Sequence, residues 1–536
     1  MKDYYAPIIL LLAFTGVIFL YNYYVKIRNE RILRAEIIKN FGKIHSKKYK
    51  GKIDGIYKRL GGNVSEITAA DLNFDKIIEK MNHNMTRLGL EYFYYRLRDL
   101  ILDESKLLKI QKNLRTNEDK EDELLEMQFQ LGKIGFFKED VLNLLEEEVK
   151  VKRELEIEVM IFSFTAVYIL ILFIFLKAQA ILFIFVLLGI NIYIYKKFNS
   201  ITLGKLESLV RLKNILFVAE SLTKNKNKVF IEELQELENI LRDLAPLKRT
   251  LKSFGFLTGN AEMDFAETYK NILFLSEARR FSKAQKYFKK YGEEIHRLYY
   301  LIGKIDCEIG IISITKAYGT NYADFGEKVF GKNLYNPLLK DPVPNDLDLE
   351  RSIILTGSNA SGKSTYLRTI GINTAFALSF GVFFGERLEI KPMKLRSAID
   401  ISDSIMENLS YFMAETKAIG EMIGDGEEKM ILLDEIFRGT NTIDRIASAT
   451  ATLKYLARNN HVVAATHDIE LTLLLKDLYK NMHFEEKIEE GDIKFDYLLK
   501  EGPATSRNAI AILDNLNYPR EIISEARDLS KVLEER

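Results

Sequence analysis

The sequence has little cysteine, little proline and no excess of charge. Cys307 is the only cysteine, so the chain cannot form an intrachain disulfide, and no Cys/His cluster has the spacing of a zinc site. Eight prolines in 536 residues favour long, uninterrupted helices. The chain has 77 Lys and Arg against 76 Asp and Glu, which excludes a global basic excess of the kind that attracts nucleic acid. Any nucleic-acid surface would be a local patch.

Three long apolar runs interrupt an otherwise ordinary globular composition. They cover residues 6–24, 157–176 and 178–195, and each is close to the length that crosses the hydrocarbon of a bilayer. The second and third runs predict a tight helical hairpin that crosses the membrane twice. A secretory signal is the alternative for the first run, but little positive charge precedes it and no small-residue cleavage site follows it. A buried helix pair is the alternative for the hairpin, but both runs are apolar all round.

Charged residues beside the runs predict their orientation. Lys and Arg are frequent after the first run, and they also flank the hairpin at 150–153 and 196–197. By the positive-inside rule these flanks are cytoplasmic, which places the N-terminus and the turn at Lys177 outside. We therefore expect a multi-pass protein of the cell membrane. The basic stretch after the first run is either a topology signal or a contact for anionic lipid heads.

The rest of the chain shows two kinds of sequence pattern. Leu, Glu and Lys recur with helical spacing before and after the hairpin, which predicts amphipathic helices. In the C-terminal part short apolar strands alternate with helices, which is typical of an α/β domain with a parallel sheet. The predicted segments are an N-terminal anchor (1–25), a basic juxtamembrane segment (26–60), the first part of a helical core (61–156), a membrane hairpin (157–195), the second part of the core (196–320) and an α/β domain (321–536).

One motif predicts a phosphate-binding loop. An apolar strand signal at 353–355 runs into Gly357-x-x-x-x-Gly362-Lys363-Ser364 and then into a helical pattern, which is the context that this motif requires. The glycines let backbone N–H groups turn toward phosphates, and the helix N-terminus adds positive potential. Lys363 is expected to reach the β- and γ-phosphates of ATP, and Ser364 to ligate Mg²⁺. The residues of this loop assigned to the nucleotide are Gly357, Asn359, Gly362, Lys363, Ser364 and Thr365.

Two further strand ends carry groups suited to hydrolysis. The apolar segment 430–433 ends in Asp434, expected to hold Mg²⁺ through water, and Glu435, expected to orient and deprotonate the attacking water. Another apolar strand ends in Thr466 and His467. Ligand sites of α/β sheets form at the carboxyl ends of strands, so His467 is expected to sense the γ-phosphate. A purely structural histidine is the alternative.

These segments in combination resemble the MutS family of ATPases. TGSNASGKSTYLRTIG is similar to the family's phosphate loop, ILLDEIFRGTNTIDRIA to its Walker B strand and the loop after it, and LSYFMAE to its signature S-x-F-x-x-E. EGPATSRNAIAILDNLNYPREIISEARD resembles its closing segment, and DLNFDKIIEKMNHNMTRLGLEYFYYRLRD the start of its helical core domain. The main matches span roughly 320 to 530. The resemblance implies a phosphate-loop ATPase domain with an ABC-ATPase-like sheet that hydrolyses ATP with Mg²⁺.

The sequence also departs from the family pattern. Ser358, Ala360 and Ser361 stand where Pro, Met and Gly are usual, and Asn441, which we assign to nucleotide binding, stands where Ser is usual. Arg507-Asn508 replaces the usual Tyr-Gly. No segment resembles the mismatch-reading domain, and the membrane hairpin lies where a DNA clamp interrupts the helical core of repair proteins. Mismatch-specific recognition is therefore not expected, while DNA is a candidate partner.

The resemblance implies a site shared between two chains. In the family the signature Ser of one subunit meets the γ-phosphate held by the other. Ser410 is therefore expected to act in trans within a homodimer, donating a hydrogen bond to charge on the transferring phosphoryl group. The alternative is that Ser410 only caps the helix that follows it.

Three functions fit these features. The first is a membrane-anchored MutS-like ATPase whose nucleotide cycle moves helical arms that grip DNA or another partner. The second is a component of a membrane ABC-type transporter, but the apolar runs lack the charged residues of a substrate path, and the signature is SYFMAE rather than LSGGQ. The third is a scaffold that binds ATP without turnover, which the retained Glu435 and His467 argue against. The sequence favours the first.

Overall fold

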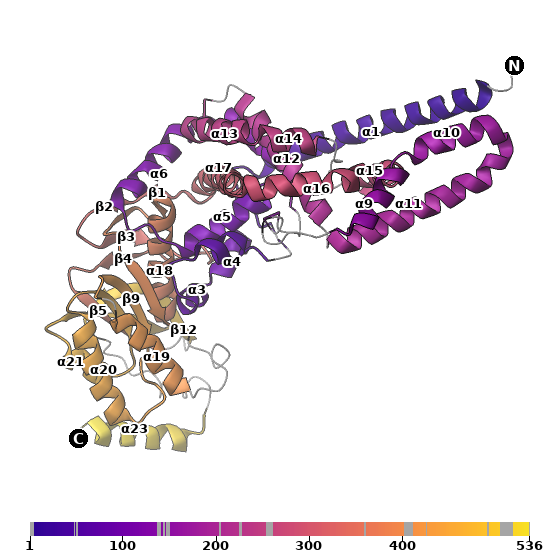
Figure 1. Ribbon diagram of the computed structural model, residues 1–536. Coiled ribbons are helices and arrows are strands. Elements are labelled where there is room, and N and C mark those ends of the chain that lie inside the picture. The colour runs from indigo at the N-terminus through magenta and orange to yellow at the C-terminus, as the bar shows by residue number, and fades with distance from the viewer. Residues whose placement is uncertain are drawn as a thin grey trace. The chain divides into compact units, whose positions relative to one another are not determined.

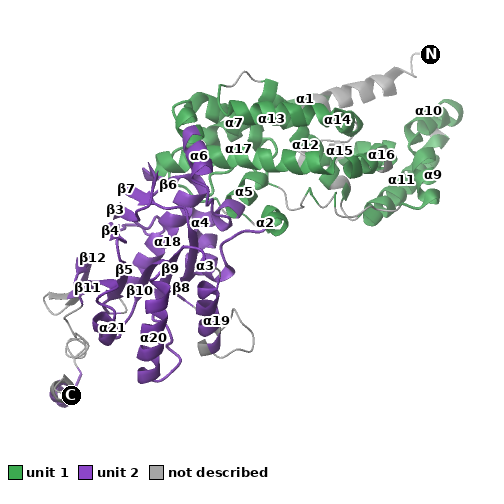
Figure 2. Cartoon of the chain, turned by 60° about the vertical axis from the view of Figure 1, so that its left-hand side comes forward, with its two compact units in different colours: residues 1–60, 81–94, 113–317 green, residues 61–80, 95–112, 318–536 purple. Residues whose placement is uncertain are grey.

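The computed structural model separates into two compact units, each discontinuous along the chain (Figure 2). Unit 1 comprises Met1–Leu60, Met81–Tyr94 and Asn113–Ala317, and unit 2 comprises Gly61–Lys80, Tyr95–Lys112 and Tyr318–Arg536. The segment boundaries expected from the sequence stay predictions. The residues that the structure describes are 5–47, 49, 52–136, 141, 142, 145, 151–202, 205–224, 228–252, 261–358, 361–400, 411–424, 426–489, 492–503 and 518–534.

Unit 1 is built from helices, as the spacing of its apolar residues predicts. Three of the helices below, α5, α6 and α17, contribute residues to both units. The helices are α1 (Tyr5–Asn40), α2 (Gly55–Leu60), α5 (Arg87–Arg98), α6 (Glu104–Asn117), α7 (Glu121–Gly132), α9 (Arg153–Phe162), α10 (Thr165–Leu176), the short 3₁₀ helix η2 (Lys177–Gln179), α11 (Ala180–Thr202), α12 (Lys205–Lys224), α13 (Ile231–Asp243), α14 (Ala245–Leu251), α15 (Ala261–Phe274), α16 (Ser276–Lys290) and α17 (Gly292–Tyr318).

Helix α17 forms the centre of unit 1. Most of its residues from Ile295 to Ile314 are buried, and Gly303 lets the chain at Leu88 come so close that a Cβ would lie 2.6 Å from the Leu88 carbonyl oxygen. The fully buried Asp306 accepts hydrogen bonds from the backbone N–H groups of Met85 and Thr86 and from the Thr86 hydroxyl. This carboxylate supplies acceptors for N–H groups at the start of α5, which have no partner within the helix.

The predicted hairpin is present as α10 and α11, which run side by side and are joined by η2 (Figure 1). Its apolar side chains are exposed, with Phe175 79%, Leu182 72% and Phe185 70% accessible. Single exposed apolar residues are common on folded proteins, but a contiguous apolar surface marks an interaction with another protein or with lipid.

The expectation of three membrane spans is corrected by the described residues, which support one span or at most two. Helix α11 is long and apolar enough to cross a membrane, and α9 with α10 would make a second span only as a pair bent by 45°. The hydroxyls of Ser163 and Thr165 donate to the carbonyls of Met160 and Phe162, and such local bonds compete with the helical ladder and bend helices. The first predicted run lies in α1, where most of its side chains lie outside the described residues.

A buried amide lies between the hairpin and α15. The side chain of Asn191 is fully buried, accepts a hydrogen bond from the Thr165 hydroxyl and donates to the carbonyls of Phe162, Ile272 and Leu273. At the base of the hairpin Lys197 pairs with Glu158 at 3.3 Å. The apolar helices therefore enclose polar groups that are hydrogen-bonded within unit 1.

Unit 2 combines strands and helices in the alternation that the sequence predicts. Its helices are α3 (Glu66–Asp71), α4 (Phe74–Lys80), α18 (Lys363–Phe380), α19 (Tyr411–Ile423), α20 (Thr442–Leu456), α21 (Ile469–Leu474) and α23 (Arg520–Glu534). Its strands are β1 (Asn321–Tyr322), β2 (Asp324–Phe325), β3 (Phe330–Leu334), β4 (Asn345–Asp348), β5 (Ser352–Thr356), β6 (Val382–Phe383), β7 (Arg387–Ile390), β8 (Lys394–Ala398), β9 (Lys429–Asp434), β10 (His461–Ala465), β11 (Tyr479–Glu489) and β12 (Asp492–Glu501).

The main sheet of unit 2 has six strands in the order β12-β11-β5-β10-β9-β8. All its neighbours pair in parallel except β11 and β12, which are antiparallel. The three predicted strands, β5, β9 and β10, lie next to one another in the middle of the sheet. Their carboxyl ends therefore share one edge, which is where ligands bind in sheets of this kind. Strands β8, β11 and β12 were not predicted.

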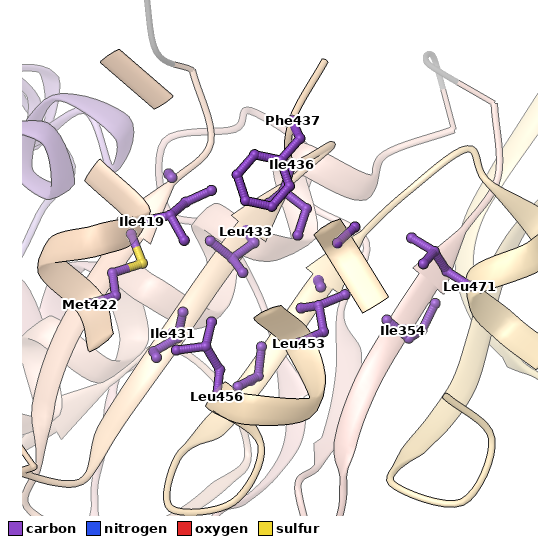
Figure 3. Packing of buried hydrophobic residues seen from close by; sticks show 14 of the residues in the cluster. Ile354, Ile419, Met422, Ile431, Leu433, Ile436, Phe437, Leu453, Leu456 and Leu471 are labelled. Carbon is purple, nitrogen blue, oxygen red and sulfur yellow. The ribbon is translucent and has the colours of Figure 1, made fainter. Parts of the chain in front are cut away.

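A continuous apolar core fixes this sheet between its helices. Ile431 and Leu433 of β9 pack with Ile419 and Met422 of α19 and with Leu453 of α20 (Figure 3). Each of these side chains is at most 3% exposed. The strand ends that follow this core are thus attached to rigid elements, which is the arrangement that a precise site requires.

Candidate active site

The strand β5 runs directly into the predicted phosphate loop. All five residues of β5 are buried, and the chain then turns through Gly357 (φ +140°) and Gly362 (φ +107°), both in conformations that side-chain-bearing residues rarely adopt. At Gly357 a Cβ would also lie 2.8 Å from the Phe484 carbonyl oxygen. Helix α18 begins at Lys363, so its N-terminus faces the loop. Asn359 and Ala360 lie outside the described residues.

Lys363 is folded back into the loop that precedes it. Its ammonium donates to the carbonyl oxygens of Gly357 at 2.6 Å and Ser358 at 2.8 Å, and its Nζ lies 3.4 Å from Nε2 of His467. Burial lowers the pKa of Lys363 to about 8, against the raising effect of Asp434 and Glu435. A cation held in this way inside a ring of backbone groups is placed to meet phosphate oxygens.

Ser364 and Asp434 meet as the predicted metal pair. The Ser364 hydroxyl, in the first turn of α18, donates to the Oδ2 atom of Asp434 at the end of β9. Burial raises the pKa of Asp434, and its Oδ1 atom is buried without a hydrogen-bond partner among the described residues. A hydroxyl and a carboxylate with a vacant acceptor form a hard oxygen donor set that fits Mg²⁺. In the described part of the chain no group of three His, Cys, Asp or Glu forms a metal cluster, so the ion would depend on phosphate and water for its other ligands.

Glu435 and His467 are in direct contact. The Oε1 atom of Glu435 lies 2.6 Å from Nε2 of His467, and its Oε2 atom accepts from Nε of Arg438 at 2.5 Å. Burial opposes ionisation of Glu435, but the hydrogen bonds and charges of His467 and Arg438 prevail and lower its pKa to about 2. Its φ of +52° is unusual for a residue with a side chain, and its N–H donates to the Ala465 carbonyl at 2.9 Å. The structure therefore brings together Lys363, Ser364, Asp434, Glu435 and His467.

Comparison with known proteins identifies this part of the chain. Residues 353–534 match the family model of MutS domain V. Residues 353–534 therefore belong to the MutS domain V family. The DNA mismatch repair protein MutS of Thermus caldophilus is 28% identical over 255 residues, which are 46% of this chain and 31% of that protein. The DNA mismatch repair protein MutS of Listeria monocytogenes serotype 4b is 32% identical over 284 residues, which are 48% of this chain and 32% of that protein. The chain thus matches about a third of the length of these relatives.

Besides Asn359, two predicted residues of the MutS domain V are not brought to this cluster by any described contact. Asn441 caps helix α20, accepting from the Asp444 N–H at 3.0 Å and donating to the Asp444 carboxylate at 2.5 Å. Its contact with nucleotide stays a prediction. Ser410 lies outside the described residues, so its action in trans also stays a prediction.

Thr365 lies on the wall of a cleft that the sequence did not reveal. The cleft has a volume of about 540 Å³, and Gly362, Ser364 and Thr365 line it together with the aromatic side chains of Phe484 and Tyr497. Phe484 belongs to β11 and Tyr497 to β12, the hairpin missing from the predicted strands. Tyr497 is 44% exposed, and an accessible aromatic ring next to a phosphate loop suits the base of a nucleotide. The alternation of apolar and charged residues in 479–501 was the signal that could have indicated this hairpin.

Three other polar residues of the site were not assigned from the sequence. Arg438 contacts Glu435, as described above. Glu486 of β11 accepts a hydrogen bond from the hydroxyl of Ser358 in the loop at 3.1 Å. Arg445 of α20 forms two hydrogen bonds with Asp468, at 2.9 and 2.7 Å, directly after His467. Arg438 and Arg445 lie within the segment that resembles Walker B and the loop after it, but the Glu486–Ser358 and Arg445–Asp468 pairs join residues that are distant in sequence, so no local motif indicates these contacts.

Proposed function

We propose that this chain is a membrane-anchored ATPase that binds and hydrolyses ATP with Mg²⁺. The observation that carries this proposal is the junction of β5, β9 and β10, where Lys363, the Ser364–Asp434 pair and the Glu435–His467 pair occupy one edge of a parallel sheet. These are the groups that phosphoryl transfer needs, namely a cation for the phosphates, hard oxygen ligands and a carboxylate that accepts a proton from water.

Each residue has a separate task in this proposal. Lys363 exchanges its carbonyl partners for oxygens of the β- and γ-phosphates, and backbone N–H groups at the start of α18 face the same charge. Bound Mg²⁺ would be held by Ser364 and Asp434 and would neutralise charge on the phosphates. Glu435 takes the proton of the attacking water, and His467 holds its carboxylate in place and contacts the γ-phosphate. The cleft beside Thr365 receives the base.

The active unit that we propose is a homodimer. Ser410 of each chain serves the nucleotide that its partner holds, as the MutS resemblance implies. Helix α19 begins at Tyr411, the residue after Ser410 in the sequence, and packs in the core of unit 2. ATP binding would then bring the two ATPase domains together, and movement of this kind is what the long helices of unit 1 could transmit to a partner.

The membrane is the proposed location of the apolar helices. Exposed Phe, Leu and Ile side chains cover α10 and α11, while Lys177 at the turn and the Glu158–Lys197 pair mark the two ends of this apolar surface. We propose that the ATPase domain lies in the cytoplasm and the Lys177 turn outside. In intact cells, a cysteine placed beside Lys177 should react with an impermeant reagent, whereas one beside Glu428 should not. Cys307 is buried and gives little background. The reverse pattern of labelling would contradict this topology.

DNA is the proposed partner, because the relatives matched are DNA mismatch repair proteins. Nothing in the chain resembles the domain that reads mismatches, so we propose binding without mismatch specificity. Purified protein in detergent should hydrolyse ATP, and DNA should stimulate this hydrolysis equally with and without a mismatch. A Lys363→Ala variant controls for contaminating ATPases. Absence of turnover in the wild-type protein would leave an ATP-binding scaffold, and turnover that DNA does not change would exclude DNA as the partner.

A further inference from the structure

Glu415 lies beneath the turn that carries the proposed catalytic base. It belongs to helix α19, is only 3% exposed, and accepts a hydrogen bond from the backbone N–H of Phe437 through Oε1 at 2.5 Å. Phe437 follows Glu435 by two residues in the turn after β9. A side chain of the signature segment therefore contacts the backbone that positions Glu435 of the same chain.

This turn has an unusual backbone that needs support. Glu435 has φ +52° and Phe437 has φ +64°, both in the left-handed region, which is unfavourable for residues with a Cβ. One side of the turn is held by the hydrogen bond from the Glu435 N–H to the Ala465 carbonyl. The other side is held by Glu415. Removal of the Glu415 carboxylate would free the turn to relax, and Glu435 would leave the position where it meets His467.

Helix α19 and the turn after β9 also pack against each other. Ala418, Ile419 and Met422 of α19 are buried in the same apolar cluster as Ile436 and Phe437 of the turn (Figure 3). Close-packed side chains transmit displacement because a packed interior yields little to strain. A shift of α19 therefore reaches the turn through packing and through one directed hydrogen bond.

The second oxygen of Glu415 indicates a role beyond simple support. Its Oε2 atom is buried and has no hydrogen-bond partner among the residues described. Burial raises the pKa of Glu415, while the backbone N–H groups of Phe437 and Arg438 and the Arg438 charge lower it. A buried carboxylate with one vacant oxygen is costly, but an apolar side chain here would remove the acceptor of the Phe437 N–H.

We propose that Glu415 is a positioning residue that couples the two nucleotide sites of the dimer. This inference rests on the proposed function, in which Ser410, five residues before Glu415 in sequence, engages the ATP of the partner chain. Contact of Ser410 with the partner's ATP displaces α19. Glu415 then positions the turn that carries Glu435 of its own chain for hydrolysis. Each site hydrolyses ATP efficiently when the other site holds ATP.

The test compares three substitutions of equal or similar size. Glu415→Met keeps the volume but removes the acceptor, Glu415→Gln keeps an oxygen that accepts the Phe437 N–H, and Glu421→Gln changes an exposed residue of the same helix as a control. Turnover and its dependence on ATP concentration are measured for each, with ATP affinity and thermal unfolding alongside. We expect kcat of the Met variant to fall about tenfold and its Hill coefficient to fall from above 1 to 1, with ATP affinity unchanged. The Gln variants should keep the wild-type Hill coefficient.

A mixed dimer separates coupling from local support. When one chain carries Lys363→Ala, its own site cannot hold ATP, and the intact site of the wild-type partner should slow. When the intact chain also carries Glu415→Met, loss of the second ATP should have no additional effect. Equal behaviour of the Met and Gln variants, or a Hill coefficient that Glu415→Met leaves unchanged, would overturn the inference. Absence of wild-type turnover in the same assay would instead overturn the proposed function.

Discussion

Two regions of the molecule leave different kinds of groups without partners. One is the candidate site of unit 2, which contains Lys363, Asp434 and Glu435, and the other is the hairpin of unit 1, formed by α10 and α11. Around the phosphate loop, buried oxygens of Asp434 and Glu415 have no partner among the described residues, and two residues of the adjoining turn have left-handed backbones. In the hairpin the polar Asn191 is fully hydrogen-bonded, and apolar side chains such as Phe175 are exposed instead. The first region therefore offers vacant acceptors, and the second offers an exposed apolar surface.

This difference indicates how each region would respond to substitution. In the cluster of unit 2, a change of charge should alter chemistry with little effect on folding, because strain and unpaired groups are concentrated there. In the hairpin, a change in a polar side chain should alter stability with little effect on chemistry. The four predictions that follow test this separation in order of decreasing effect.

The largest effect is expected for Glu435→Gln. The amide keeps the shape of the side chain but cannot accept the proton of water, so turnover should fall by roughly 10²–10⁴-fold while ATP still binds. An ATP-held dimer should accumulate, which light scattering would detect. Glu421→Gln, on the surface of α19, is the control and should hydrolyse normally. Wild-type turnover in the Glu435 variant would remove this residue from the catalytic role.

A second effect concerns ATP affinity at high pH. Burial lowers the pKa of Lys363 to about 8, and nearby phosphates would raise it again because they favour the charged form. ATP affinity should therefore be highest below pH 8 and fall by up to about tenfold per pH unit above it, with uptake of a proton on binding. Calorimetry in buffers of different ionisation enthalpy measures both quantities.

The control for this pH dependence is Lys363→Arg, which stays charged throughout the range and should show none of it. Lys363→Ala should lose tight binding at every pH. An affinity that stays constant from pH 7 to pH 10 in the wild-type protein would show that Lys363 keeps its proton in the empty site.

A third prediction addresses the hairpin. Asn191→Leu removes a donor from the carbonyls of Ile272 and Leu273 and an acceptor from Thr165, so the free energy of unfolding of unit 1 should fall by about 1–3 kcal/mol. Hydrolysis per folded molecule should be unchanged. Thermal unfolding in detergent measures the difference, with Ile192→Leu as the neighbouring control. Equal stability of the two variants would mean that the buried amide contributes nothing to the hairpin.

The smallest effect at neutral pH is expected for Arg438→Ala. This change removes one of the two groups that lower the pKa of Glu435 to about 2, so the pKa should rise toward its ordinary value. Glu435 stays ionised at pH 7 in both proteins, and turnover there should change little. The acid limb of the pH profile should move to higher pH in the variant. A limb that does not move would show that His467 alone determines this pKa.

The lowered pKa of Glu435 also predicts how the stability of the protein depends on pH. Because the folded-state pKa of Glu435 is lowered, its contribution to stability is present above the unfolded pKa and is lost as pH falls toward about 2. Arg438→Ala should reduce that contribution, so acid unfolding of the variant should begin at a higher pH. Circular dichroism during acid titration provides the measurement.

Sequence patterns were most informative where function depends on the end of a strand. The apolar segments before Gly357, Asp434 and Thr466 are β5, β9 and β10, as expected, and they lie side by side. Sequence patterns were less informative in unit 1. Apolar runs predicted three membrane spans, but the helix pair of the second run is bent by 45° where the hydroxyls of Ser163 and Thr165 bond to nearby carbonyls. A hydropathy pattern does not reveal such local bonds.

The sequence by itself determined which residues form the core of the candidate site. The spacing of Gly357, Gly362 and Lys363 and the acids at the end of β9 predict a nucleotide site, because a phosphate loop is made from contiguous residues and parallel strands end at a common edge. Only the tertiary structure decided which distant groups support that chemistry. Glu415 meets Phe437 across 22 residues, and Phe484 and Tyr497 reach the loop from a hairpin further along the chain. Such contacts depend on how elements pack. The spacing of apolar residues within one element does not predict which distant element packs against it.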